Sequence, residues 1–266
     1  MNKKHQGELY RKEVLKLLAR VGYASTRQIA KGVWKRCDVS TRKMAGRTLR
    51  WLLDERLIVS RRESKGVINV NSELLYALTS KGTMEARRVG SPLVAEKLHA
   101  RDYLKNSHSH RTACNSVFVA LPNQVVWSEL EVRAKIPRLH TFNYTFEDNV
   151  ISKIPDLIAV TPENRWEWLE VENSWRSEKD LLKVRDCIRA MFRRENHIGC
   201  MHFVVTVPGA RTIGTRLAKL MTSENFDNYL NTGELDTQIL ENHLKISVLN
   251  HETMTLTELD WKKQKG

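Results

Sequence analysis

The sequence predicts an α+β fold with two domains, and three observations lead to this prediction. Apolar residues in the first third recur at helical spacing. After about residue 105, strand-like runs alternate with helical runs, which is typical of a mixed sheet. The charge also changes along the chain. Residues 1–90 contain 21 Lys+Arg and 8 Asp+Glu, whereas the rest of the 266 residues contains 23 of each. We therefore expect one domain at 1–90, a connector to about 105, and a second domain at 106–266.

Three helices are predicted in the N-terminal part. The first covers residues 8–21, and the second follows the cap signal Ser25-Thr26. The third covers residues 42–58 after Ser40-Thr41. The expected inner face of the third helix consists of Met44, Leu49, Leu52 and Leu53. Its opposite face is basic, and β-prone runs with a turn at Lys65-Gly66 come next.

Three helices followed by a basic hairpin resemble a winged helix-turn-helix domain over residues 8–82. The resemblance implies that the third helix enters the major groove of DNA and that the hairpin contacts backbone or minor groove. The residues that match these roles are Arg42, Lys43, Arg47 and Arg50 on the helix, and Arg61, Arg62 and Lys65 on the hairpin. Such side chains neutralise phosphates and release counterions, so we expect a double-stranded DNA partner. A winged helix used only for protein contacts is the alternative.

The C-terminal part is expected to form a mixed sheet with helices. The predicted elements are a helix at 108–121, a strand-like run at 124–133, a loop-rich insertion at 134–153, strands at 154–162 and 166–174, a helix at 177–194, a strand at 201–207, a helix near Arg211 and a strand at 244–250. A short turn joins the strands at 154–162 and 166–174, so these two strands should pair as a hairpin.

Three carboxylates should meet on this hairpin. Asp156 opens the first strand, and Glu170 and Glu172 lie two residues apart on the second, where side chains share a face. Adjacent like charges repel, which either a solvated edge strand or a bound cation would explain. Clustered oxygen ligands suit Mg²⁺ or Mn²⁺. Such an ion would polarise a phosphate and lower the pKa of an attacking water.

Pro155-Asp156, followed after a turn by Glu170-x-Glu172, resembles the PD-(D/E)xK restriction-endonuclease-like superfamily. The resemblance implies that Asp156 and Glu170 are metal ligands. Glu172 stands where the family usually has lysine and is then an extra ligand. Some members supply the lysine from the next helix, where Lys183 is our choice, although it could be an ordinary helix lysine.

An element before the Asp strand often adds an acidic residue in this superfamily, and Glu129 matches that place. It is then a further candidate metal ligand. Glu131, two residues later, is expected to be a surface charge. His110 could bind phosphate or orient a ligand, or it could cap or pack against its helix.

The order of YALTSKG, the helix from His110 to Asn115, WSELEVR, IPDLIAV and WLEVENS is similar to the replication-relaxation family and to the MobC-type relaxases of mobilisable plasmids. This resemblance implies a metal-dependent endonuclease that nicks one DNA strand at a plasmid transfer origin during conjugative mobilisation. A second mobilisation or coupling protein would act beside it. The alternatives are a replication or transcription regulator with an inactive nuclease-like domain, and a nuclease that cuts both strands. The residues leave hydrolytic and covalent tyrosine cleavage both open.

Composition limits the environment of the protein. No run of 18 apolar residues is present, so no membrane span is expected. The four cysteines are scattered without a CxxC pair, which argues against a disulfide framework or a zinc-thiolate site. We therefore expect a cytoplasmic protein.

Overall fold

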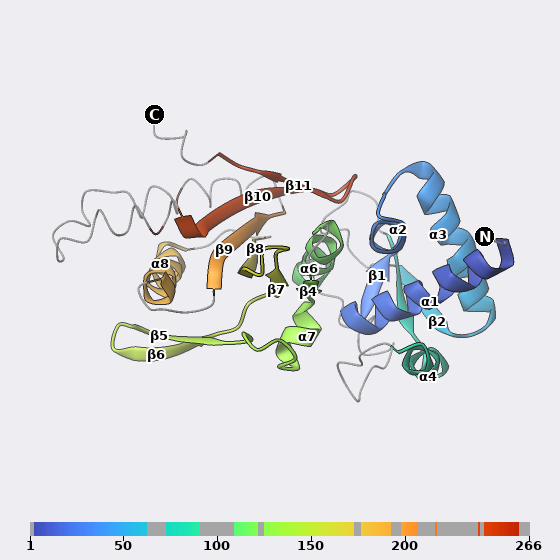
Figure 1. The fold of residues 1–266 in the computed structure, drawn as a ribbon, viewed down its shortest axis with the longest axis horizontal. Helices are drawn as coiled ribbons and strands as arrows, with labels where there is room; N and C mark the ends of the chain where they lie inside the picture. The colour runs from blue at the N-terminus through green and yellow to red at the C-terminus, as the bar shows by residue number, and fades with distance from the viewer. Residues whose placement is uncertain are drawn as a thin grey trace.

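The computed structural model contains two main sheets with helices around them (Figure 1). It describes residues 3–62, 73–90, 109–121, 125–172, 177–192, 198–206, 216, 239 and 242–260. Helices and strands both occur in both parts, so the α+β class that the sequence predicts is confirmed.

The N-terminal part combines helices with a small antiparallel sheet. Its elements are α1 (Lys3–Val21), β1 (Tyr23–Ser25), α2 (Thr26–Trp34), α3 (Val39–Asp54), β2 (Ile58–Arg62), β3 (Leu74–Leu78) and α4 (Ser80–Arg88). The strand order is β1-β3-β2, with both pairs antiparallel. The three predicted helices are present. The predicted turn at Lys65-Gly66 lies outside the described residues.

Local capping explains where these helices begin. Ser25 caps α2 through a capping box with Gln28. The third helix starts three residues earlier than predicted because Asp38 accepts a hydrogen bond from the Thr41 N–H (2.8 Å). The inner face also differs from the prediction. Its buried residues are Thr41, Ala45, Leu49 and Leu52, whereas Met44 and Leu53 are only half-buried. Helical spacing counted from Thr41 selects this set.

The C-terminal part is built on a six-stranded mixed sheet. Its elements are α6 (Ser109–Ala120), β4 (Val125–Trp127), α7 (Glu129–Arg133), β5 (Phe142–Phe146), β6 (Asn149–Lys153), β7 (Leu157–Val160), β8 (Trp166–Glu172), α8 (Glu178–Phe192), β9 (Ile198–Val205), β10 (Leu244–Asn250) and β11 (Thr255–Glu258). The strand order is β11-β10-β9-β8-β7-β4, in which β8, β9 and β10 run parallel and the other pairs antiparallel. The predicted mixed sheet and its central hairpin are therefore confirmed.

Two predictions in this part were wrong. The run at 124–133 is not one strand, because Ser128 forms a capping box with Glu131 and starts α7 after the short β4. The insertion at 134–153 is not mainly loop, because β5 and β6 pair as a regular hairpin. Its turn residues Glu147 and Asp148 both adopt positive φ (47° and 61°), as a two-residue hairpin turn of type I′ requires. The helix predicted near Arg211 lies outside the described residues.

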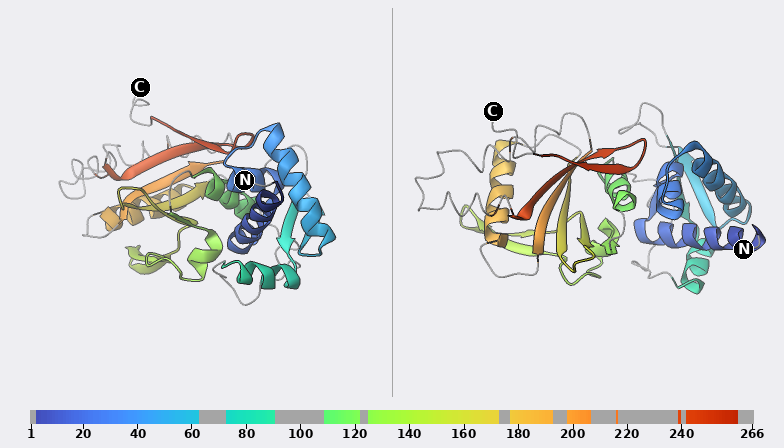
Figure 2. Two further views of the ribbon diagram at one scale, coloured as in Figure 1. Left: turned by 45° about the vertical axis from the view of Figure 1, so that its right-hand side comes forward. Right: turned by 45° about the horizontal axis from the view of Figure 1, so that its top comes forward.

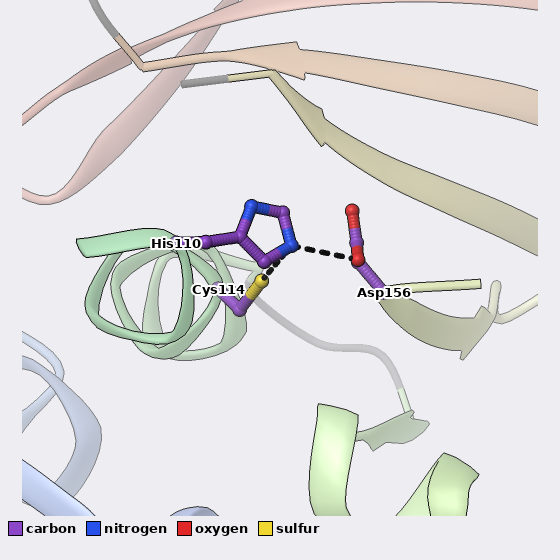
Figure 3. Close-up of side chains that lie close together, drawn as sticks. All are labelled: His110, Cys114 and Asp156. Atoms are coloured by element: carbon purple, nitrogen blue, oxygen red, sulfur yellow. Dashed lines mark hydrogen bonds and ion pairs between the residues drawn. The ribbon is translucent and has the colours of Figure 1, made fainter. Parts of the chain in front are cut away.

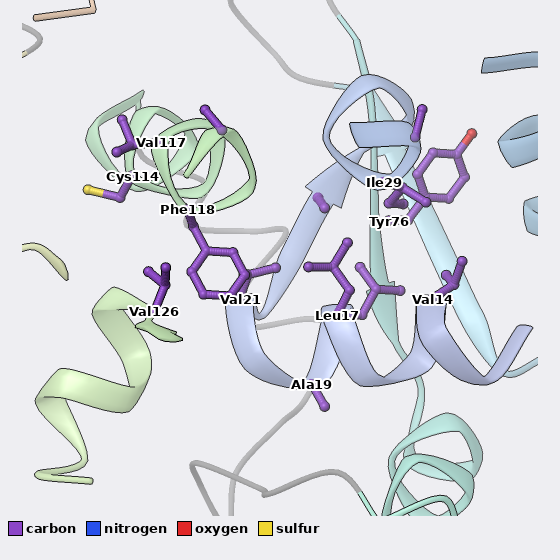
Figure 4. Close-up of a cluster of buried hydrophobic side chains, with 14 of the residues drawn as sticks. Val14, Leu17, Ala19, Val21, Ile29, Tyr76, Cys114, Val117, Phe118 and Val126 are labelled. Carbon is purple, nitrogen blue, oxygen red and sulfur yellow. The ribbon is translucent and has the colours of Figure 1, made fainter. Parts of the chain in front are cut away.

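Helices cover the two faces of the large sheet. On one face, α8 packs through Leu181 and Val184 in a cluster that includes Ile158 and Trp168. On the other face, α6 packs through Ala113 and Val117 in a second cluster. That second cluster continues from the sheet through α6 into α1 and α2 (Figures 2 and 4). The N-terminal helices therefore rest directly on the helix that covers the sheet.

Candidate active site

Asp156 lies directly before β7 and is held there by strand β8 and helix α6. Its N–H donates to the Leu169 carbonyl (3.1 Å), and its Oδ2 accepts from the Val171 N–H (2.8 Å). Its Oδ1 lies 2.8 Å from Nε2 of His110, on the first turn of α6. The Asp156 side chain is 16% exposed and that of His110 is 40% exposed. The carboxylate is thus fixed in position and still reachable from solvent.

Glu170 is almost completely buried on the central strand β8. Its Oε1 accepts from the Trp168 indole N–H (2.7 Å), and its Oε2 lies 2.7 Å from Nζ of Lys153. Burial raises the pKa of Glu170, and the nearby charge of Asp156 raises it further, although Lys153 acts in the opposite direction. Glu170 and Asp156 are neighbours across the hairpin, because the register pairs Leu157 with Leu169.

Glu172 is also buried, at the end of β8. Its backbone carbonyl accepts from the N–H and the hydroxyl of Thr206 (3.0 and 3.2 Å). Because β8 lies between β7 and β9, it is an interior strand rather than an edge. A solvated edge strand therefore does not explain the paired glutamates. Two acidic side chains are instead buried on an interior strand, where an uncompensated charge is costly.

The three predicted carboxylates lie along one hairpin but do not surround one point. Among the described residues, the group with ligand atoms all within 4.8 Å of one another is His110, Cys114 and Asp156 (Figure 3). Glu170 instead faces Lys153 and Trp168. Asp156 and Glu170 nevertheless fit a hard divalent ion in kind, because both offer carboxylate oxygens from opposite positions of the hairpin.

A lysine that the sequence analysis missed contacts the site. Lys153 comes from β6, three residues before Asp156, and its side chain is largely buried against Glu170. The predicted lysine, Lys183 on α8, lies 3.6 Å from Oδ1 of Asp180. Both lysines line a small cavity of about 150 Å³ between the β5–β6 hairpin and α8. The sequence did place Lys153 close to the predicted ligand Asp156, only three residues before it. Because residues 134–153 were expected to be mainly loop, Lys153 was not considered as a residue of the site.

Glu129 is buried on α7 between two arginines. Its carboxylate oxygens lie 3.1 Å from Nε of Arg111 and 2.8 Å from Nε of Arg133. Burial acts to raise the pKa of Glu129, but the two guanidinium groups outweigh it, so that the pKa lies below its ordinary value. A carboxylate already paired with two cations is a poor ligand for a third. The structure thus gives the predicted ligand Glu129 a different environment from Asp156 and Glu170.

The residues predicted to bind DNA lie on the outside of the N-terminal part. Lys43, Arg47 and Arg50 are exposed and Arg42 is half-buried on α3. The helical spacing places Lys43, Arg47 and Arg50 opposite the buried face of that helix and Arg42 on its flank. Arg61 and Arg62 are exposed at the end of β2. Lys65 lies outside the described residues.

Comparison with known proteins identifies one relationship. The sequence model of the replication-relaxation family matches residues 15–187, which run from α1 into α8 and include Asp156, Glu170 and Glu172. No curated protein and no solved structure matches the chain. None of the described helices combines the length and the apolarity needed to cross a membrane.

Proposed function

The chain belongs to the replication-relaxation family, which indicates plasmid-related DNA processing, and we propose that it is a metal-dependent nickase. In this proposal the N-terminal part is a winged helix that binds the transfer origin of a plasmid. The C-terminal part is a PD-(D/E)xK-type nuclease domain that cuts one strand. A second mobilisation or coupling protein would act beside it in the cytoplasm.

One observation carries the proposal: a buried carboxylate, Glu170, lies beside a reachable one, Asp156, with a lysine against it. Mg²⁺ or Mn²⁺ would be held by Asp156 and Glu170, with Glu172 next along the same face of β8. The ion would supply Lewis-acid stabilisation of the phosphate and activation of a water.

Other residues of the site would orient the ligands and stabilise the phosphate. Asp156 is fixed from both sides, by the Val171 N–H and by His110, so its orientation is set before a ligand arrives. Lys153 carries a positive charge into the same buried region, where it can stabilise a phosphate that gains charge during cleavage. His110 lies at the solvent-exposed side of Asp156, where DNA would approach.

A specific observation favours the alternative of a DNA-binding regulator without nuclease activity. Lys153 already neutralises Glu170, so the buried charge does not require a metal in order to be compensated. The usual lysine after Glu170 is also absent, since Glu172 takes its place. The two proposals share the winged helix and differ only in the chemistry of the C-terminal part.

Nicking of supercoiled plasmid with the transfer origin tests the proposed enzyme. Cleavage should require Mg²⁺ or Mn²⁺ and should be lost in Asp156→Asn and Glu170→Gln. Glu147→Gln, in an exposed turn residue, is the matched control. Normal nicking by Asp156→Asn would contradict the site. No nicking or metal binding by the wild type, combined with tight origin binding, would favour the regulator.

The form of the product distinguishes the remaining alternatives. A nickase stops at open circles, whereas a nuclease that cuts both strands gives linear DNA. Analysis of the new 5′ end separates hydrolysis from a covalent link to tyrosine, because only the link leaves protein attached to the DNA.

The salt dependence of binding tests the proposed DNA face. Arg47→Ala should weaken origin binding and reduce the slope of log K against log[salt] by about 0.9 if Arg47 contacts one phosphate. Arg88→Ala, an exposed arginine on α4, should leave the slope unchanged. An unchanged slope for both Arg47→Ala and Arg50→Ala would exclude α3 as the phosphate-contacting helix.

A further inference from the structure

Two residues of α6 and the residue directly before β7 turn toward a common point (Figure 3). His110 and Cys114 are four residues apart, so they lie on the same side of the helix. Nε2 of His110 lies 2.8 Å from Oδ1 of Asp156 and 3.5 Å from Sγ of Cys114. These three atoms all lie within 4.8 Å of one another. The i,i+4 spacing brings the sulfur of Cys114 to His110, and the position of Asp156 adds a carboxylate oxygen to the same nitrogen.

The separation of the His110 nitrogen and the Cys114 sulfur agrees with a tetrahedral metal site. With Zn–N and Zn–O bonds of about 2.0 Å and Zn–S of about 2.3 Å, ligand atoms stand about 3.3 to 3.6 Å apart. The separation of nitrogen and sulfur already has this value. The separation of nitrogen and oxygen would have to increase by about half an ångström from the hydrogen-bonded distance. A small rotation of the half-exposed His110 ring provides that adjustment.

We propose that His110, Cys114 and Asp156 bind a single Zn²⁺-type ion. Imidazole and thiolate favour Zn²⁺ and Co²⁺ over Mg²⁺, which prefers oxygen ligands only. Three protein ligands leave a fourth position for water or another oxygen donor, as in zinc sites that are not closed. Because Cys114 is buried, its thiol proton must be released to solvent when the ion binds.

The proposed zinc site shares Asp156 with the proposed Mg²⁺ site. Occupation by Zn²⁺ would engage Oδ1 of Asp156 and reduce its availability to Mg²⁺ or Mn²⁺. Zn²⁺ should therefore inhibit metal-dependent nicking. The inhibition rests on the proposed function, whereas zinc binding itself does not, so the two are tested by separate readouts.

Absorption spectra with Co²⁺ test the binding. The full-length protein, stripped of metal with a chelator, should take up one equivalent of Co²⁺. It should show a near-ultraviolet thiolate-to-cobalt band, and Zn²⁺ should abolish that band. The band should disappear in Cys114→Ala and Cys114→Ser, and remain in Cys187→Ala, a matched change at another buried cysteine. His110→Gln should weaken binding by at least the roughly 10- to 100-fold that even outer-shell partners contribute.

Two results would overturn the zinc site: absence of the thiolate band in the wild type at one equivalent, or its persistence in Cys114→Ser. The serine variant keeps the size of the side chain, so it decides the question if the alanine variant unfolds.

The nicking assay tests whether the two metal sites share Asp156. Zn²⁺ should slow nicking by the wild type relative to its own zinc-free rate, and it should slow nicking by Cys114→Ser to a smaller extent. Equal zinc sensitivity of both would overturn the sharing of Asp156. A protein that gains the cobalt band but never nicks would refute the nickase and support the zinc site.

Discussion

Arg20 on α1 and Glu131 on α7 form a bidentate ion pair between the N-terminal helices and the large sheet. Nε and one terminal nitrogen of Arg20 lie 2.7 and 2.9 Å from the two carboxylate oxygens of Glu131. Glu131 is 2% exposed, and its Oε2 also accepts from the Ser128 N–H (2.7 Å). The hydroxyl of Ser128 donates to the Arg20 carbonyl (2.6 Å). The capping box of one helix thus also binds the end of another.

Removal of Arg20 should destabilise the protein. Arg20→Ala leaves a buried carboxylate without its cation, which usually costs about 3–5 kcal/mol. The Arg20 side chain is 32% exposed, so water can replace part of it, and we expect a loss of about 2–3 kcal/mol in the free energy of unfolding. Urea unfolding measures this loss. Arg88→Ala, which breaks the exposed pair with Glu85, should cost less than about 1 kcal/mol, and an equal effect of both changes would contradict the argument.

The same junction should fix the distance between the bound DNA sequence and the nick. Gln28 on α2 donates to the Thr112 carbonyl and to the Ser116 hydroxyl (2.9 Å each), and Asn115 donates to the Tyr23 carbonyl (2.8 Å). All three contacts hold α6, which also carries His110 of the site. Buried polar contacts of this kind resist sliding, because each break leaves an unsatisfied group.

Insertions in the transfer origin test this rigid arrangement. Adding five base pairs between the bound sequence and the nick position rotates the cut site by about half a helical turn. Nicking at the original nucleotide should then be lost, while binding in a footprint stays unchanged. Adding about ten base pairs returns the cut site to the original face of the DNA helix but leaves it one helical turn farther from the bound sequence. This insertion should therefore not rescue nicking. Unaltered cleavage at the original nucleotide after either insertion would show that the two parts move independently.

The sequence predicted what depends on local pattern. Periodicity located α1, α2, α3, α6 and α8, and the apolar runs located β7, β8, β9 and β10. Asp156 and Glu170 were expected to meet, because a short turn between two strands fixes their register. Some errors came from local caps that were overlooked, at Asp38 and Ser128, and others arose where tertiary contacts decide. Glu131 was expected at the surface, but Arg20, 111 residues away, makes its burial possible.

The remaining site residues depend on pairings that no short window contains. Lys153 reaches Glu170 only because β5 and β6 form a hairpin beside α8, and the alternation of Phe142, Tyr144 and Phe146 did not show where that hairpin would lie. Cys114 and His110 had helical spacing, but their convergence on Asp156 requires α6 to lie beside the start of β7. Such long-range placement follows from packing, not from spacing.

Two glycines should respond oppositely to alanine. Gly46 lies in the interior of α3 with nothing within 4 Å of an added Cβ, so Gly46→Ala should stabilise the protein by about 0.5–1 kcal/mol. An added Cβ at Gly82 in α4 would lie 1.8 Å from the Leu57 carbonyl oxygen, so Gly82→Ala should destabilise it by about 1–3 kcal/mol or more. Thermal unfolding of both variants gives the comparison. A stabilising Gly82→Ala would show that α4 does not approach the Leu57 carbonyl this closely.

Acid should remove the stabilisation that Glu129 provides. Its pKa in the folded protein lies below the ordinary value of 4.5, so the ionised form stabilises the fold above that value. As pH falls below 4.5 and through the folded pKa, this contribution is lost. Glu129→Gln should therefore lower stability at neutral pH and flatten the acid limb of a plot of unfolding free energy against pH. Equally steep acid limbs in the two proteins would assign the pH dependence to other carboxylates.

Lys153, not Lys183, should matter more for cleavage. Lys153 lies 2.7 Å from Glu170 in the buried site, whereas Lys183 lies beside Asp180 and is 38% exposed. If Lys153 stabilises the phosphate during cleavage, Lys153→Met should slow single-turnover nicking by about 10²- to 10³-fold, the usual effect of removing one such donor. Lys183→Met, the matched change on α8, should slow it less than about tenfold, because solvent screens an exposed charge.

Stability must be measured beside the rate, because Lys153 also compensates the buried Glu170. Lys153→Met is expected to lower the unfolding free energy, since Glu170 then keeps only its Trp168 hydrogen bond among the contacts described above. A purely structural lysine would change stability but not the rate per folded molecule at saturating Mg²⁺. Lys153→Arg should recover most of the stability and part of the rate, because it restores a charge with different geometry. A greater loss of rate in Lys183→Met would instead assign the catalytic lysine to α8, where the sequence resemblance placed it.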